Sequence, residues 1–212
     1  MTDETKNLIR RKISDLSTKR PGSAQLIKNI VTDSLAIASS RNSEVTELDV
    51  SDQGLTEIDL SSYPELKELD CRKNQLSELD LSHTPKLTGI FFEDNQLTEL
   101  DLSHTPKLRH LWCSNNQLTE LDLSHTPELK ELMCDDNELS ELDLSNTPEL
   151  ESLDCSETQL KELDLSHTCE LTRLFCNNNQ LTELDLSCTQ ELTRLFCSNN
   201  QLTELDLSHT PE

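Results

Sequence analysis

The sequence predicts a curved solenoid of the α/β class: eight copies of a 21-residue unit, a parallel β-sheet along the concave face, and a helical cap at the amino end. The first observation is that similar units begin at Val45 and recur every 21 residues to residue 212. A fixed period of this length is typical of solenoids. The second is that apolar residues recur at positions 1, 4, 6, 11, 14 and 16 of each unit, where they can share one core. We therefore predict a cap over residues 1–44 and a repeat domain over 45–212.

The fifth unit shows the consensus of the first half of each unit. It reads Leu129-x-x-Leu132-x-Cys134-x-x-Asn137-x-Leu139, which resembles the leucine-rich-repeat signature. With cysteine at position 6 and a period of 21, the chain looks most like the bacterial cysteine-ladder subclass found in some internalin-like surface proteins. This resemblance implies contact between a bacterium and its host. We expect this chain to have neither the signal peptide nor the wall-anchoring motif of that family, and therefore do not expect an exported surface role.

The amino-terminal segment predicts two helices. Residues 3–19 place apolar side chains on one helical face, Pro21 and Gly22 end that pattern, and Ser23 can cap a second helix. A solenoid needs such a cover because its first unit otherwise exposes its leucines. An alternative is a targeting segment for a specialised export system, since Arg10, Lys12 and neighbouring residues form a basic cluster.

The repeats are strongly acidic. Residues 1–44 carry a net charge of +3 and residues 45–212 carry −26, which gives −23 for the chain. Such a field repels nucleic acid and anionic membranes and favours a basic protein partner, although it also keeps a long leucine stack soluble. No apolar run reaches the ~18 residues of a membrane helix. The amino terminus lacks the pattern of a secretory signal, so general export is not expected.

Six of the eight cysteines occupy position 6, which points inward. Neighbouring strands lie about 4.8 Å apart, wider than the Cβ separation that a disulfide prefers. We therefore expect free buried thiols and no disulfide framework, which indicates a reducing compartment. The expected location is the cytoplasm, or a host cytoplasm if the protein is delivered as an effector.

Each unit is expected to form a strand over positions 3–7, followed by a turn in which Asn at position 9 pairs backbone groups. Gln53 and Thr158 interrupt this asparagine ladder, and looser turns are expected there. The second half of each unit hardly changes, with Glu at position 13 and Asp at position 15 in all eight units. These carboxylates form a solvated face or, alternatively, attract cations such as Ca²⁺.

The outward positions of the first half differ from unit to unit and give the candidate binding site. A contiguous apolar patch usually marks an interface, and Trp, Phe, Met and Arg are enriched at interface centres. The candidate anchors are Phe91, Trp112 and Met133, with His110 and Glu131 beside them. A second patch combines Phe175 and Phe196 with Arg173 and Arg194. The alternative is that the position-5 aromatics pack along the ladder without binding a partner.

No catalytic or cofactor site is predicted. Five of the six histidines form a column at position 18, which repeat duplication of a turn residue explains. His167, Cys169, Cys188 and His209 have a zinc-binding composition, but columns about 5 Å apart fit tetrahedral geometry only with distortion. We therefore expect no metal, no cofactor and no enzyme activity.

The sequence ends at Glu212 on a unit boundary, and either a longer natural chain or dimerisation through this uncovered end is expected. The function predicted is a non-enzymatic module that binds a protein through the concave face, as a bacterial effector or adaptor. One alternative is the substrate-recognition part of a larger enzyme, and another is a structural array without a dedicated partner.

Overall fold

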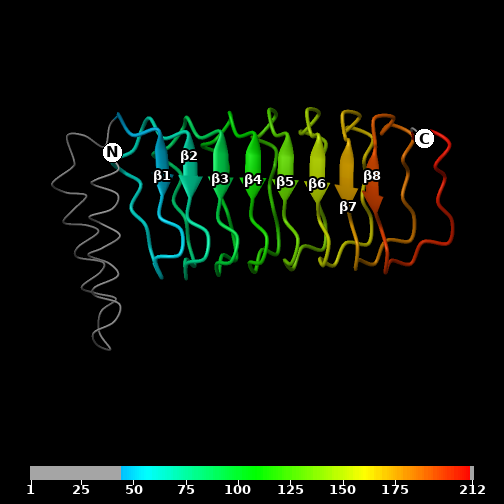
Figure 1. Cartoon of the computed structure of the whole chain (residues 1–212), viewed down its shortest axis with the longest axis horizontal. Coiled ribbons are helices and arrows are strands. Elements are labelled where there is room, and N and C mark those ends of the chain that lie inside the picture. The colour runs from blue at the N-terminus through cyan, green and yellow to red at the C-terminus, as the bar shows by residue number, and fades with distance from the viewer. Residues whose placement is uncertain (1–43, 211–212) are drawn as a thin grey trace.

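Eight short parallel strands form one sheet in the computed structural model, which describes residues 44–210. The predicted helical cap lies outside the described residues. The strands follow one another in chain order across the sheet (Figure 1). Their bounds are β1 (Glu47–Asp49), β2 (Glu68–Asp70), β3 (Gly89–Phe91), β4 (His110–Trp112), β5 (Glu131–Met133), β6 (Ser152–Asp154), β7 (Arg173–Phe175) and β8 (Arg194–Phe196).

The strands pair in register, so equivalent positions of successive units lie side by side. Trp112 pairs with Phe91 on one side and Met133 on the other. The strands cover positions 3–5 and are thus shorter than the predicted 3–7. The reason is the residue at position 8, which turns the chain with φ between 53° and 58° in every unit. Hydrogen bonds between turns continue past the strands, as from the Cys113 amide to the Met133 carbonyl at 2.7 Å.

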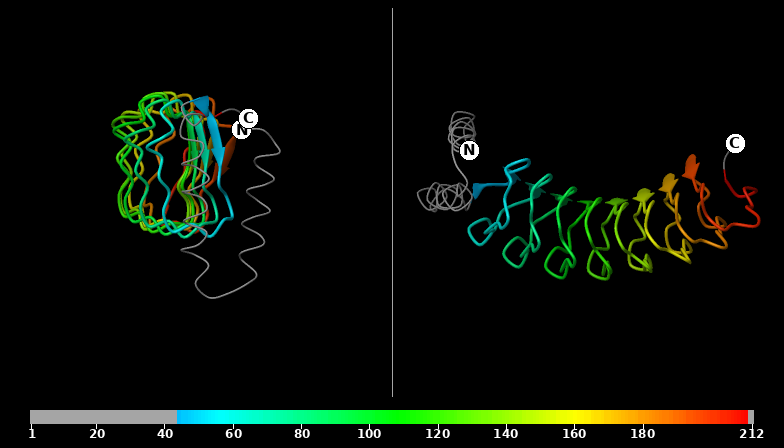
Figure 2. Two further views of the ribbon diagram at one scale, coloured as in Figure 1. Left: turned by 90° about the vertical axis from the view of Figure 1, so that its left-hand side faces the viewer. Right: turned by 90° about the horizontal axis from the view of Figure 1, so that it is seen from below.

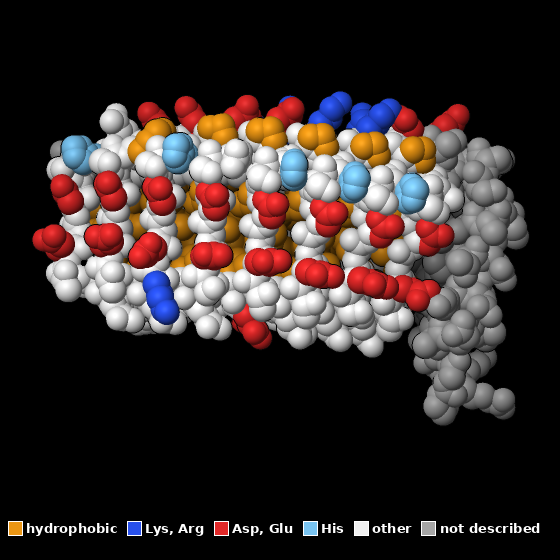
Figure 3. Space-filling model, turned by 180° about the vertical axis from the view of Figure 1, so that it is seen from behind, with side chains coloured by type: hydrophobic (Ala, Val, Ile, Leu, Met, Phe, Trp, Pro, Cys, Tyr) orange, Lys and Arg blue, Asp and Glu red, His pale blue; other side chains and the backbone are white. Residues whose placement is uncertain are grey.

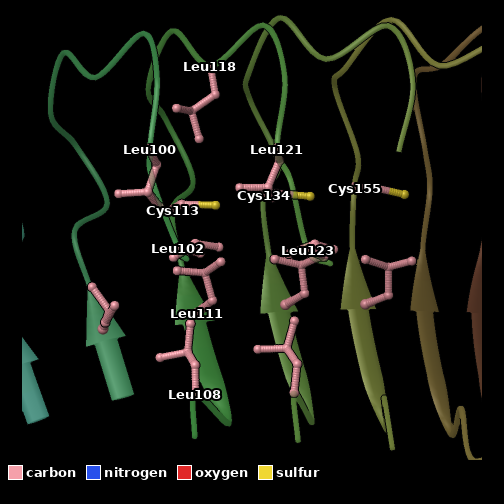
Figure 4. Close-up of a cluster of buried hydrophobic side chains, with 14 of the residues drawn as sticks. Leu100, Leu102, Leu108, Leu111, Cys113, Leu118, Leu121, Leu123, Cys134 and Cys155 are labelled. Carbon is pink, nitrogen blue, oxygen red and sulfur yellow. The ribbon is translucent and has the colours of Figure 1, made fainter. Parts of the chain in front are cut away.

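Leucines from both halves of each unit fill one continuous core. Figure 4 shows Leu108 and Leu111 on the strand side with Leu121 and Leu123 from the second half of the unit. The thiols of Cys113, Cys134 and Cys155 follow one another at the same level in successive turns, and these side chains are fully buried. Phe92 takes the same position in the third unit and is also fully buried.

The asparagine ladder pairs the buried turns as predicted. Asn116 Oδ1 accepts from the Leu97 amide at 3.1 Å, and its Nδ2 donates to the carbonyls of Phe92 and Cys113. Thr158 interrupts the ladder: its hydroxyl donates to Asn179 Oδ1 at 2.6 Å. A threonine hydroxyl has a single hydrogen to donate and cannot repeat the four contacts of the carboxamide.

The stack is curved, with the strands on its inner side and the second halves of the units on its outer side (Figure 2). We call these the concave and convex faces. In the eighth unit Phe196 and Leu207 are half exposed, at 52% and 51%. Dimerisation through this unit stays a prediction. Among residues 44–210, no helix is long and apolar enough to cross a bilayer.

Candidate partner-binding site

The three predicted anchors lie side by side on strands β3, β4 and β5 of the concave face. Phe91 and Trp112 meet edge to face, with ring centroids 4.9 Å apart and planes at 81°. Met133 follows Trp112 in register. All three side chains are partly buried. We call Phe91, Trp112 and Met133 the anchor row.

A glycine makes room for the first ring of this row. A Cβ atom on Gly89 would lie 3.2 Å from two ring carbons of Phe91, which is closer than ordinary van der Waals contact. The absence of a side chain at position 3 therefore lets the Phe91 ring lie back across its own strand. The position of that ring in turn sets the edge-to-face contact with Trp112.

A guanidinium group already rests against the anchor row. Arg72 Cζ lies 5.8 Å from the centroid of the Phe91 ring and 5.9 Å from that of Trp112, within cation–π range. The same guanidinium forks onto Asp70, with contacts of 2.9 and 2.6 Å. Its Nε also lies 3.9 Å from Glu93 Oε2. The aromatic pair thus accepts a cation held by carboxylates.

Beside the anchor row is an open hollow of about 540 Å³, which we call the acidic hollow. It is lined by Glu93, Asp94, Trp112, Ser114, Asn115, Met133, Asp135 and Asp136. Partial burial raises the pKa of Glu93 and that of Asp135. Sequence reasoning did not select these carboxylates; their variation at position 7 from unit to unit was the available signal.

The polar residues at position 3 bind one another instead of flanking separate patches. His110 Nδ1 lies 3.2 Å from Glu131 Oε2, and Arg173 donates to Glu131 Oε1 at 2.9 Å. Arg173 reaches over the intervening unit, where Ser152 is small and fully buried. Arg173 of the second patch thus pairs with Glu131 of the first, and this ion pair joins the two patches.

The second patch keeps its aromatic pair. Phe175 and Phe196 stack with centroids 5.0 Å apart and planes at 9°. Arg194 stands beside them at the first position of β8 and is exposed. Whether either aromatic row binds a partner stays a prediction, because the same contacts also stabilise the sheet by roughly 0.5–1.5 kcal/mol per pair.

Two rows of carboxylates cross the convex face, with apolar side chains between them (Figure 3). A hollow of about 1090 Å³ runs between these rows. The aspartates are already engaged: Asp122 accepts from the Ser124 amide at 2.9 Å, and the serine contacts lower its pKa. Within the described range, no group of three or more His, Cys, Asp or Glu residues could hold a metal ion.

The cysteines divide into a buried set and one bonded pair. The six ladder cysteines are free thiols, as predicted, and burial raises the pKa of Cys71 and Cys176 to about 12. Cys169 and Cys188 form a disulfide, so the expectation of no disulfide is wrong for this pair. They occupy positions 20 and 18 of successive turns, and this offset brings their Cα atoms to 4.9 Å. They are thereby bonded to each other rather than available to bind zinc with His167.

Comparisons with known proteins agree with this architecture. A family model described as leucine-rich repeats in two copies matches residues 85–125. The functional domain of InlJ from Listeria monocytogenes, which includes a cysteine ladder, is 34% identical with a TM-score of 0.69. The alignment covers 81% of this chain and 43% of that one, so the chain spans less than half of the InlJ domain.

Two further Listeria monocytogenes structures share the fold at lower identity. Internalin C2 is 21% identical with a TM-score of 0.77, and 81% of each chain is covered. Internalin InlF is 24% identical with a TM-score of 0.69, over 74% of this chain and 48% of that one. Among curated protein sequences, none matches significantly. The 21-residue period, the asparagine and cysteine ladders and these matches show that the chain has the leucine-rich-repeat fold with a cysteine ladder, and that it is similar to internalin structures of Listeria.

Proposed function

We propose that this chain is a protein-binding module that contacts its partner through the concave face, centred on the anchor row. The observation that carries the proposal is the continuous row of Phe91, Trp112 and Met133 across three adjacent strands. The equivalent residues of β1, β2 and β6 are aspartates. Large apolar side chains at consecutive positions of a solvent-facing sheet are typical of a binding surface.

The contrast between the two faces supports the same proposal. Positions 13 and 15 of the convex face are Glu and Asp in every unit, whereas positions 3, 5 and 7 of the concave face vary. A partner that contacts several turns would be selected by the face that varies. Such a module would act as a bacterial effector or adaptor. The alternative is that it forms the substrate-recognition part of a larger enzyme.

The test is a capture experiment with a matched control. The intact chain, a Phe91→Ala, Trp112→Ala, Met133→Ala variant, and an Asp49→Ala control would each be immobilised and exposed to host and bacterial lysates. Both variants change position 5 only. They therefore differ in whether apolar or acidic side chains are removed, and not in the position within the unit. Circular dichroism would verify that all three proteins are folded.

We expect a captured protein to bind the intact chain and the aspartate control alike and to lose at least roughly tenfold in affinity for the alanine variant, since hot spots often contribute 2 kcal/mol or more. The purified partner would then be titrated in solution to obtain the dissociation constants. Equal binding to all three proteins would show that the anchor row stabilises the sheet and does not bind.

A further inference from the structure

The acidic hollow beside the anchor row identifies the chemistry of the partner more closely, and this inference rests on the proposed function. Four of its eight lining residues are acidic and none is basic. Its volume of about 540 Å³ lies within the range of ~300–1,000 Å³ typical of ligand pockets, which leaves room for a side chain and adjoining backbone. Trp112 and Met133 supply an apolar wall to the same space.

The carboxylates of the hollow are poorly compensated within the chain. Glu93 Oε2 is buried without a hydrogen-bond donor, and the Arg72 Nε that lies 3.9 Å from it already donates to Asp70. Asp135 accepts from a neutral donor, the hydroxyl of Ser114. Burial of a carboxylate whose oxygens lack hydrogen-bond donors or a close counter-charge is unfavourable. A cation brought by a partner would remove this cost.

The indole of Trp112 favours a ligand that offers both a hydrogen-bond acceptor and a cation. Its Nε1 is buried without an acceptor, so it lacks a carbonyl or carboxylate oxygen. Its ring already attracts the guanidinium of Arg72 at 5.9 Å, which shows on this surface that a cation is accepted against the aromatic pair. A basic side chain on a polypeptide meets both needs, because the cation faces the ring and the carboxylates while the adjoining backbone offers carbonyl oxygens.

We propose that the acidic hollow receives an arginine or lysine side chain from a basic segment of the partner. Trp112 and Met133 pack against its stem, and Glu93 and Asp135 bind its charged end. Arginine is the better fit, since its planar group stacks on aromatic rings and forks onto carboxylates. The net charge of −23 draws such a segment toward the chain, and the hollow selects where it docks.

The probe for this test is the peptide N-acetyl-glycyl-arginyl-glycinamide, added to the full ¹⁵N-labelled chain. The chain has one tryptophan, so a single indole N–H signal reports on the hollow. The control peptide carries citrulline, which has nearly the shape of arginine without its charge. We expect a saturable shift of the indole signal with the arginine peptide, with a dissociation constant of roughly 1–10 mM, and no saturable shift with citrulline.

Two isosteric variants separate the hollow from general charge attraction. Glu93→Gln with Asp135→Asn removes two charges from the hollow, and Glu141→Gln with Asp143→Asn removes two from the convex face. We expect the first variant to weaken peptide binding by roughly tenfold and the second to leave it unchanged within about twofold. The retained indole signal in both variants would show that the fold is intact.

Several outcomes would overturn the proposal. Equal shifts with both peptides, equal weakening by both variants, or no saturable shift would each show that no basic side chain is selected here. An indole shift with calcium chloride but not with the peptide would assign the hollow to a metal ion. A shift that depends on protein concentration alone would assign it to a second copy of the chain.

The same variants keep this inference distinct from the proposed function. If the captured partner is lost with the alanine variant of the anchor row but binds the Glu93→Gln, Asp135→Asn variant normally, the function stands and the basic side chain is wrong. If the captured partner binds both variants as tightly as the intact chain, the proposed function itself fails.

Discussion

The asparagine ladder allows one prediction to be worked out in detail, for Asn116→Ala. The side chain of Asn116 is almost fully buried and makes its hydrogen bonds to the backbone of its own turn and of the preceding one. It accepts from the Leu97 amide at 3.1 Å and donates to the carbonyls of Phe92, Cys113 and Ser114 at 3.2, 3.1 and 3.2 Å. Alanine removes all four contacts and adds no partner.

The expected cost differs among the four backbone groups that contact this side chain. The amide of Leu97 loses the acceptor that the side chain supplies, and an unpaired buried donor costs about 1–3 kcal/mol. The carbonyls of Phe92, Cys113 and Ser114 still accept from Asn95, Asn137 and the Asp94 amide, respectively. The two hydrogens of Asn116 Nδ2 are shared among these three carbonyls, so two hydrogen bonds are lost, and each costs only about 0.5 kcal/mol, the low end for one hydrogen bond. The free energy of unfolding should fall by roughly 2–4 kcal/mol.

Urea unfolding followed by the fluorescence of Trp112, in the same unit, would measure this change. The denaturation midpoint should fall while the slope with urea stays constant, because the surface exposed on unfolding is unchanged. Asn116→Thr is the matched control, since threonine already stands at this position in the sixth unit. It should cost less than alanine because its hydroxyl can still donate one hydrogen bond.

The reverse change tests the same reasoning with the opposite sign. Thr158→Asn should raise the free energy of unfolding by about 1 kcal/mol, because the Leu139 amide gains the acceptor that equivalent amides have in other units. A loss of less than about 0.5 kcal/mol for Asn116→Ala, or a destabilised Thr158→Asn variant, would refute the view that the ladder stabilises the turns.

Three further predictions concern thiols and ion pairs. Iodoacetamide at pH 8 should modify only the partly exposed Cys197 in the native chain, because burial shields the other five ladder thiols and raises their pKa. In urea all six should react, and mass spectrometry would count the adducts. Reduction of Cys169–Cys188, which are 19 residues apart, should lower the free energy of unfolding by roughly 3 kcal/mol in urea, whereas no change would contradict a disulfide in solution. Glu131→Gln should cost at most about 1 kcal/mol, and less in 0.5 M salt, because its pair with Arg173 is partly exposed; a larger, salt-independent loss would argue against this.

The order and register of the strands could be predicted from the sequence because every unit poses the same packing problem. A core leucine at position 4 finds its partner 21 residues away, and the inter-turn hydrogen bonds then fix the register. The strand length could not be predicted, because it depends on position 8. There Asp and Asn suit a left-handed backbone, but Lys73 and Glu157 adopt it as well, so no single residue type marks the turn.

The candidate site was predicted in part, and the missing part has a common physical cause. Position 5 was recognised because alternation in a strand assigns it to the outer face. The acidic hollow was missed because its carboxylates lie after the strand, where the turn at position 8 brings three units together. The disulfide was missed for a similar reason: spacing was considered between identical positions, whereas Cys169 and Cys188 are two positions out of step.

Two small residues show how a repeated ladder is converted into a specific surface. Gly89 leaves space for the ring of Phe91, and Ser152 lies buried in the unit that Arg173 crosses to reach Glu131. At both places a small residue at position 3 leaves space in which a larger side chain can be held in one orientation. Side chains that are already ordered lose less entropy when a partner binds. Gly89→Ala should therefore weaken partner binding through the displaced Phe91 ring, although residue 89 itself is buried and touches no partner.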